Sequence, residues 1–141
     1  MVVKIYNITI DGCWSDVIKG SIPKHSGVYF VYECTHNKEE KTVSLHRLIY
    51  IGESDNINDR IANHEKYDDW MKHVSKGNTL CFLIGPVPTA DRERVEAAYI
   101  FKHKPPENEE YIDSFPFDQT TVNSSGITRK LNTSFTVKRT D

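Results

Sequence analysis

A single carboxylate in an apolar surrounding is the most informative feature of the sequence. Glu96 falls in a predicted helix over residues 89–104, where its helical angle places it between Tyr99 and Ile100. A carboxylate in such a surrounding costs several kcal/mol of desolvation unless it is paired with a cation or bound to a metal. Glu96 is therefore a candidate metal ligand, although taken alone it could instead pair with Lys102 or with an arginine elsewhere.

Two tyrosines lie where neighbouring strands would bring them together. Tyr29 belongs to a predicted strand over residues 27–34 and Tyr50 to a second over residues 47–52. Because side chains alternate along a strand, antiparallel pairing of these strands can place both phenols on one face, with Tyr50 on the same side as Leu48. Gly52 would leave the space above them free of a side chain.

An arginine and a histidine follow on the next predicted helix, over residues 54–74. Arg60 and His64 stand one helical turn apart, beside the apolar stripe of Ile57 and Ile61. This placement predicts two half-buried side chains at the edge of the core. Taken alone, the pair could equally be solvated, as each tyrosine alone could be an ordinary strand residue.

The element order predicts an α/β (α+β) fold. We expect a small three-stranded mixed or antiparallel central sheet flanked by helices, with short N- and C-terminal extensions. The polar segment 35–46 is expected to be an exposed connection, and the chain to form a single domain over residues 1–141. The predicted strands cover residues 2–10, 27–34, 47–52, 78–87 (the most central) and, late in the chain, 133–139.

Composition narrows the class of protein. No apolar run approaches the length needed to span a bilayer, so we expect a cytoplasmic protein without membrane segments. The net charge of −2 and the pI of about 6.3 argue against strong non-specific binding to nucleic acid but leave room for a local basic face. Cys13, Cys34 and Cys81 are expected to be structural thiols in a reducing compartment. Cys34 with His36 and His46 is an incomplete set for zinc.

An ordered set of motifs resembles the GIY-YIG nuclease domain. "GVY" at residues 27–29 and "YIG" at residues 50–52 are followed by Arg60, eight residues after Gly52, and by His64. "VEAAYIFKHKPPEN" resembles the family's helix with a metal-binding glutamate, followed by a proline and an asparagine. The resemblance covers about residues 26–108, and the site residues that it implies are Tyr29, Tyr50, Arg60, His64, Glu96 and Asn108.

This resemblance implies a metal-dependent DNA endonuclease that hydrolyses phosphodiester bonds. It implies that Tyr29 is the candidate base, assisted by Arg60 and His64, and that Tyr50 orients the water or a phosphate oxygen. It also implies that Arg60 donates hydrogen bonds to the non-bridging oxygens, and that Glu96 holds one divalent ion, Mg²⁺ or Mn²⁺.

Four positions bear on this expectation. Asn108 would orient Glu96 or a metal-bound water, and Asn123 is its rival for that role. Val28 replaces the isoleucine of the motif, and Glu53 places a carboxylate where it would repel a phosphate. The resemblance leaves open whether the DNA is branched or read by sequence. Cutting of both strands would require a homodimer or two separate events.

Two other functions stay open at this point. One is a non-catalytic nucleic-acid-binding or regulatory module on the same fold, which the acidic balance and Glu53 favour. The other is a protein-interaction domain that uses the segment 35–46.

Overall fold

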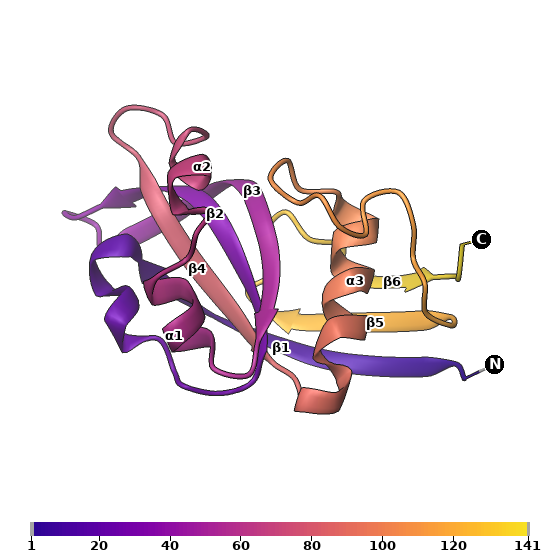
Figure 1. Cartoon of the computed structure of the whole chain (residues 1–141). Helices are drawn as coiled ribbons and strands as arrows, with labels where there is room; N and C mark the ends of the chain where they lie inside the picture. The colour runs from indigo at the N-terminus through magenta and orange to yellow at the C-terminus, as the bar shows by residue number, and fades with distance from the viewer. Residues whose placement is uncertain (1, 141) are drawn as a thin grey trace.

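The computed structural model describes residues 2–140 as a six-stranded sheet in the order β3-β2-β4-β1-β5-β6, with few helices (Figure 1). The expectation of a small three-stranded sheet flanked by helices is therefore wrong. The strands are β1 (Lys4–Ser15), β2 (Gly27–Asn37), β3 (Thr42–Ser54), β4 (Thr79–Pro86), β5 (Thr120–Gly126) and β6 (Ser134–Val137). The helices are α1 (Ile57–Ala62), α2 (Tyr67–Met71) and α3 (Arg92–His103), with short 3₁₀ turns η1 (Asp16–Ser21) and η2 (Thr89–Asp91).

The strands predicted over residues 27–34 and 47–52 pair antiparallel, as expected. β2 lies antiparallel to β3 on one side and to β4 on the other, and its residues from Gly27 to Cys34 are all buried. The segment 35–46 is not a free connection, because β2 and β3 continue through it as a hairpin with the pairs Thr35↔Ser44 and Asn37↔Thr42. Its polar side chains are exposed, which is why composition alone suggests a loop.

The sheet is wider than predicted because β1 joins two halves. Its C-terminal part pairs antiparallel with β4, and its N-terminal part runs parallel to β5, which pairs in turn with β6. The strand β5 escapes prediction because its sequence, TTVNSSG, buries only Thr120 and Val122. With Val122 as its only apolar residue, the segment shows no hydrophobic periodicity, and a polar segment of this kind resembles a loop.

The helix α3 lies in the hollow of this sheet. It contacts both edge strands, β3 and β6, as well as β2 and β5, so the sheet curls around it (Figure 1). Its apolar residues Val95, Ala98 and Tyr99 belong to the larger of the two hydrophobic clusters. The smaller cluster lies on the other face of β2 and is completed by Ile57 and Trp70 from α1 and α2.

The helix predicted over residues 54–74 is broken into two. α1 ends at Ala62, and the chain leaves helical geometry at Asn63 before α2 begins at Tyr67. This break turns His64 inward, where only 6% of the residue is exposed. Arg60 and His64 are therefore not neighbours on one helix face, as the continuous helix would have had them.

The expectation of three free thiols is wrong for two of the cysteines. Cys34 on β2 and Cys81 on β4 form a disulfide with their Cα atoms 6.1 Å apart, and Cys13 is free. Within residues 2–140, no helix has both the length and the apolar character needed to cross a membrane. The cytoplasmic location and the homodimer stay predictions.

Candidate functional site

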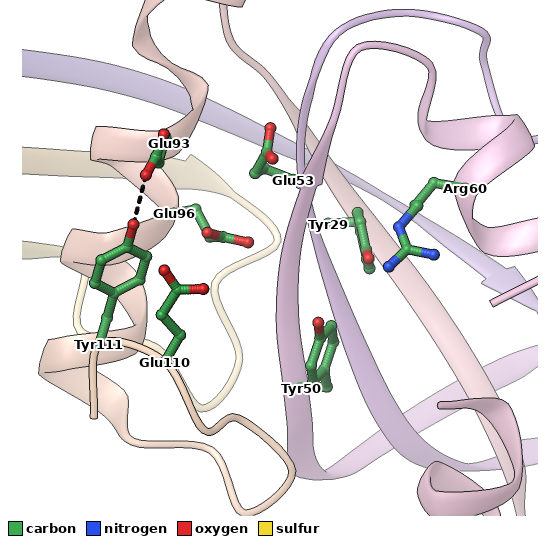
Figure 2. A pocket seen from close by; sticks show the side chains of 8 residues that line it. All are labelled: Tyr29, Tyr50, Glu53, Arg60, Glu93, Glu96, Glu110 and Tyr111. Atoms are coloured by element: carbon green, nitrogen blue, oxygen red, sulfur yellow. Dashed lines mark hydrogen bonds between the residues drawn. The ribbon is translucent and has the colours of Figure 1, made fainter. Parts of the chain in front are cut away.

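A pocket of about 350 Å³ opens along the free edge of β3, between α1 and α3. Four of the six predicted site residues line it, and they come from four different elements: Tyr29 from β2, Tyr50 from β3, Arg60 from α1 and Glu96 from α3. Figure 2 shows the two phenols and the guanidinium on one side of the β3 ribbon and the carboxylates on the other. The remaining lining residues are Glu53, Glu93, Glu110 and Tyr111.

Gly52 permits the position of Tyr29. In the β2–β3 register Gly52 faces Tyr29, whose ring lies directly over it, so that a Cβ atom at residue 52 would overlap the ring. Tyr50 lies on the same face by regular pairing, since Val31 pairs with Tyr50, and a β-bulge follows it, because the next residue, Tyr32, pairs with Leu48. The bulge places Leu48 in the opposite cluster from Tyr50, contrary to simple alternation. The two tyrosine rings lie 6.3 Å apart.

A buried histidine, His64, is hydrogen-bonded to the hydroxyl of Tyr29. The Nε2 atom of His64 lies 2.9 Å from the Tyr29 hydroxyl, and the Nδ1 atom accepts a hydrogen bond of 3.1 Å from the backbone N–H of Lys66. Burial, together with the nearby Arg60 charge, lowers the pKa of His64 to about 4, so its ring is neutral at pH 7. Because Nδ1 accepts, the proton of the neutral ring lies on Nε2 and is donated to the Tyr29 oxygen. The hydroxyl hydrogen of Tyr29 is thus not used by His64.

The pKa values of both phenols are raised, so both are protonated at neutral pH. Burial and the neighbouring Tyr50 raise the pKa of Tyr29 well above its ordinary value of 10.0, and Arg60 opposes the rise. Burial and the Glu96 carboxylate raise the pKa of Tyr50 to about 12, again against the effect of Arg60. The charge of Arg60 therefore favours the ionised form of either phenol.

The two arginines near the pocket are both engaged by carboxylates. Arg60 donates two parallel hydrogen bonds, of 2.6 and 2.7 Å, to the two oxygens of Glu65. Arg92 forms an ion pair with Glu53. The predicted repulsion between Glu53 and a phosphate is therefore partly offset by Arg92, a partner that sequence order does not reveal.

Glu96 fits a single divalent cation. Burial and the carboxylates of Glu53, Glu110 and Glu93 raise its pKa to about 8, because each of these disfavours its negative charge. A cation beside Glu96 would relieve both effects. Within residues 2–140 no three His, Cys, Asp or Glu side chains are grouped to bind a metal jointly. One carboxylate with several waters matches the coordination that Mg²⁺ usually takes.

This raised pKa predicts a pH dependence of stability. Glu96 titrates near 4.5 when unfolded and near 8 when folded, so between these values the folded state binds more protons. The free energy of unfolding should therefore fall as pH rises through this interval, and Glu96→Gln should remove that part of the fall. Urea unfolding of both proteins, in EDTA and at pH values below and above the interval, measures the difference. Identical pH profiles would contradict the assignment.

Asn108 does not line this pocket but joins the segment after α3 to β3. Its side-chain oxygen accepts from the backbone N–H of Ile51 at 2.9 Å, and its amide donates to the Ile51 carbonyl at 2.8 Å. The side chain therefore pairs with the free edge of β3 and draws the segment that carries Glu110 and Tyr111 against it. Asn123 lies on β5, bonded to Asn7 and Ser134, and does not line the pocket.

Sequence reasoning missed Glu65, Glu110 and Tyr111. Glu65 carries a weak sequence indication, since it follows His64 and lies within reach of Arg60. Tyr111 donates a 2.6 Å hydrogen bond to Glu93 across the pocket wall, a contact that depends on the path of the chain after α3. Comparisons with protein-family models, curated proteins and solved structures find no match for this chain.

Proposed function

We propose that the protein is a metal-dependent DNA endonuclease that hydrolyses phosphodiester bonds. The observation that carries the proposal is the meeting of Tyr29, Tyr50, Arg60 and Glu96 around one pocket, with His64 bonded to the Tyr29 oxygen. A cluster of two phenols, one guanidinium and one carboxylate with a raised pKa supplies the groups that attack at phosphorus requires.

The Tyr29 oxygen is the candidate base for the attacking water. To accept a proton it must first be ionised, which its burial opposes. Two features favour the phenolate: the N–H that His64 donates to the oxygen and the positive charge of Arg60. His64 itself is not a suitable base here, because its Nε2 carries the proton and its Nδ1 is bonded to the backbone of Lys66. Tyr50, whose ring centre lies 6.3 Å from that of Tyr29, would orient the water or a phosphate oxygen.

Arg60 and Glu96 would share the scissile phosphate. The planar fork of Arg60 suits the two non-bridging oxygens, which would take the place that the Glu65 carboxylate occupies. Glu96 would hold a divalent ion, Mg²⁺ or Mn²⁺, that stabilises the charge on the leaving oxygen. Asn108 acts indirectly, since both ends of its amide are bonded to Ile51.

A non-catalytic nucleic-acid-binding or regulatory module is the second candidate. The acidic lining of the pocket favours it, because Glu53, Glu93, Glu96 and Glu110 outnumber the basic groups there. The ion pair of Arg60 with Glu65 also favours it, since a phosphate must first displace that carboxylate.

Cleavage of supercoiled plasmid and of branched DNA in Mg²⁺ separates the two functions. We expect strand scission by the parent protein, no scission in EDTA, and a rate at least about 10³-fold lower for Glu96→Gln, which corresponds to about 4 kcal/mol. Glu93→Gln is the matched control, because it removes the same charge from the same pocket one turn away on α3. DNA binding without scission in any divalent ion would instead support the binding module.

A further inference from the structure

A second hollow continues the pocket along the edge of β3. It measures about 160 Å³ and shares Tyr50, Glu96 and Glu110 with the first pocket. It also takes in Lys66 and Asn108. The two hollows therefore form one groove, with Arg60 at one end, Lys66 at the other, and Tyr50 and Glu96 between them.

The two walls of this groove carry opposite charge. The wall made by α3 and the segment after it presents the carboxylates of Glu93, Glu109 and Glu110 and the carboxyl group of Glu96. The cations of the groove come from the other wall, Arg60 from α1 and Lys66 from the residue that precedes α2. Apart from the scissile phosphate, which a divalent ion would link to Glu96, the phosphates of a nucleic-acid strand in the groove would therefore lie toward the wall of α1 and α2.

Lys66 is the cation of this wall that has no partner. Arg60 is held by Glu65 in a bidentate ion pair, whereas the Lys66 ammonium makes no ion pair or hydrogen bond with residues 2–140. Its backbone is fixed, since its N–H donates to Nδ1 of His64, whose Nε2 is bonded to Tyr29. The backbone of Lys66 is thus linked to Tyr29, the candidate catalytic base, by two hydrogen bonds through His64.

We propose that Lys66 is a substrate-positioning residue that binds the phosphate next to the scissile one. The inference rests on the proposed function and extends it from one phosphate to two. A lysine suits this role because its charge is a compact point on a flexible stem and needs no fixed orientation of the phosphate. Lys66 would set the register of the strand so that the scissile phosphate lies between Arg60 and Glu96.

Three variants and one modified substrate test this role. Lys66→Gln should raise KM about tenfold with kcat unchanged, reduce the slope of log affinity against log salt by about 0.7 for a single strand, and be rescued by Lys66→Arg. Lys72→Gln is the control, because Lys72 is an exposed lysine paired with Asp69. It should change neither KM nor the salt slope. A neutral methylphosphonate at the neighbouring phosphate should raise KM for the parent but not for Lys66→Gln.

The outcomes separate this inference from the proposed function. If the parent cleaves DNA and Lys66→Gln keeps the parental KM and salt slope, the role of Lys66 is wrong and the nuclease stands. If the parent binds DNA without cutting it, the nuclease is wrong, and the same comparison of dissociation constants decides whether Lys66 contacts a phosphate. If the parent neither binds nor cuts at low salt, both proposals are overturned.

Discussion

Replacing Gly52 with alanine should lower the free energy of unfolding by about 1–3 kcal/mol and abolish DNA cleavage. The added Cβ would occupy space that the ring of Tyr29 fills. Tyr29 cannot move aside freely, because it is 1% exposed and its hydroxyl is held by His64. The substitution must therefore displace the β3 backbone or the tyrosine, and either shift would move Tyr29 away from the position proposed for the phosphate. Urea unfolding and plasmid nicking measure the two effects.

Gly20→Ala is the matched control for this prediction. No atom lies within 4 Å of the position that a Cβ on Gly20 would take, so we expect it to behave like the parent protein. Equal stability and equal activity of Gly52→Ala and Gly20→Ala would show that Tyr29 does not depend on the space above Gly52. That result would contradict the geometry of the site.

Tyr29→Phe should reduce kcat by about 10²–10⁴-fold and leave KM nearly unchanged, because the variant loses a proton acceptor without losing a phosphate contact. Its stability should fall by only about 1 kcal/mol, since it leaves the N–H of His64 without an acceptor. Steady-state cleavage of a labelled oligonucleotide in Mg²⁺, over a range of substrate concentrations, gives kcat and KM separately.

Tyr32→Phe is the control, because Tyr32 belongs to the same strand but to the opposite hydrophobic cluster. Its hydroxyl donates a 2.7 Å hydrogen bond to the carbonyl of Arg129, so the variant also loses one buried contact. Similar rates for the two variants would indicate that Tyr29 serves the fold and not proton transfer.

The sequence predicts those parts of the fold that depend on neighbouring residues. The alternation of apolar and aromatic residues in β2 and β3 suffices to predict their antiparallel pairing and the approach of Tyr29 to Tyr50. It does not reveal the bulge at Ile49 that turns Leu48 to the other face, since a bulge depends on how two strands fit together. The polar strand β5 is hidden for the same reason, because its burial depends on β1 and β6.

In the candidate site, too, the sequence predicts some features, while others depend on contacts between distant residues. Residue types and spacing suffice to predict that Tyr29, Tyr50, Arg60 and Glu96 lie around one pocket. Two ion pairs of the site, Arg60 with Glu65 and Arg92 with Glu53, are contacts between side chains that spacing alone does not specify. The engagement of Asn108 by Ile51 likewise depends on the path of the chain after α3.

A crystal structure of the Tyr29→Phe variant with Mn²⁺ and a short DNA strand tests the central claim most directly. We expect one Mn²⁺ bound to the Glu96 carboxylate and one phosphate lying between that ion and Arg60, with Glu65 released from the guanidinium. Anomalous scattering identifies the ion. A strand bound elsewhere on the protein, or Mn²⁺ bound away from Glu96, would show that these side chains do not share a phosphoryl group.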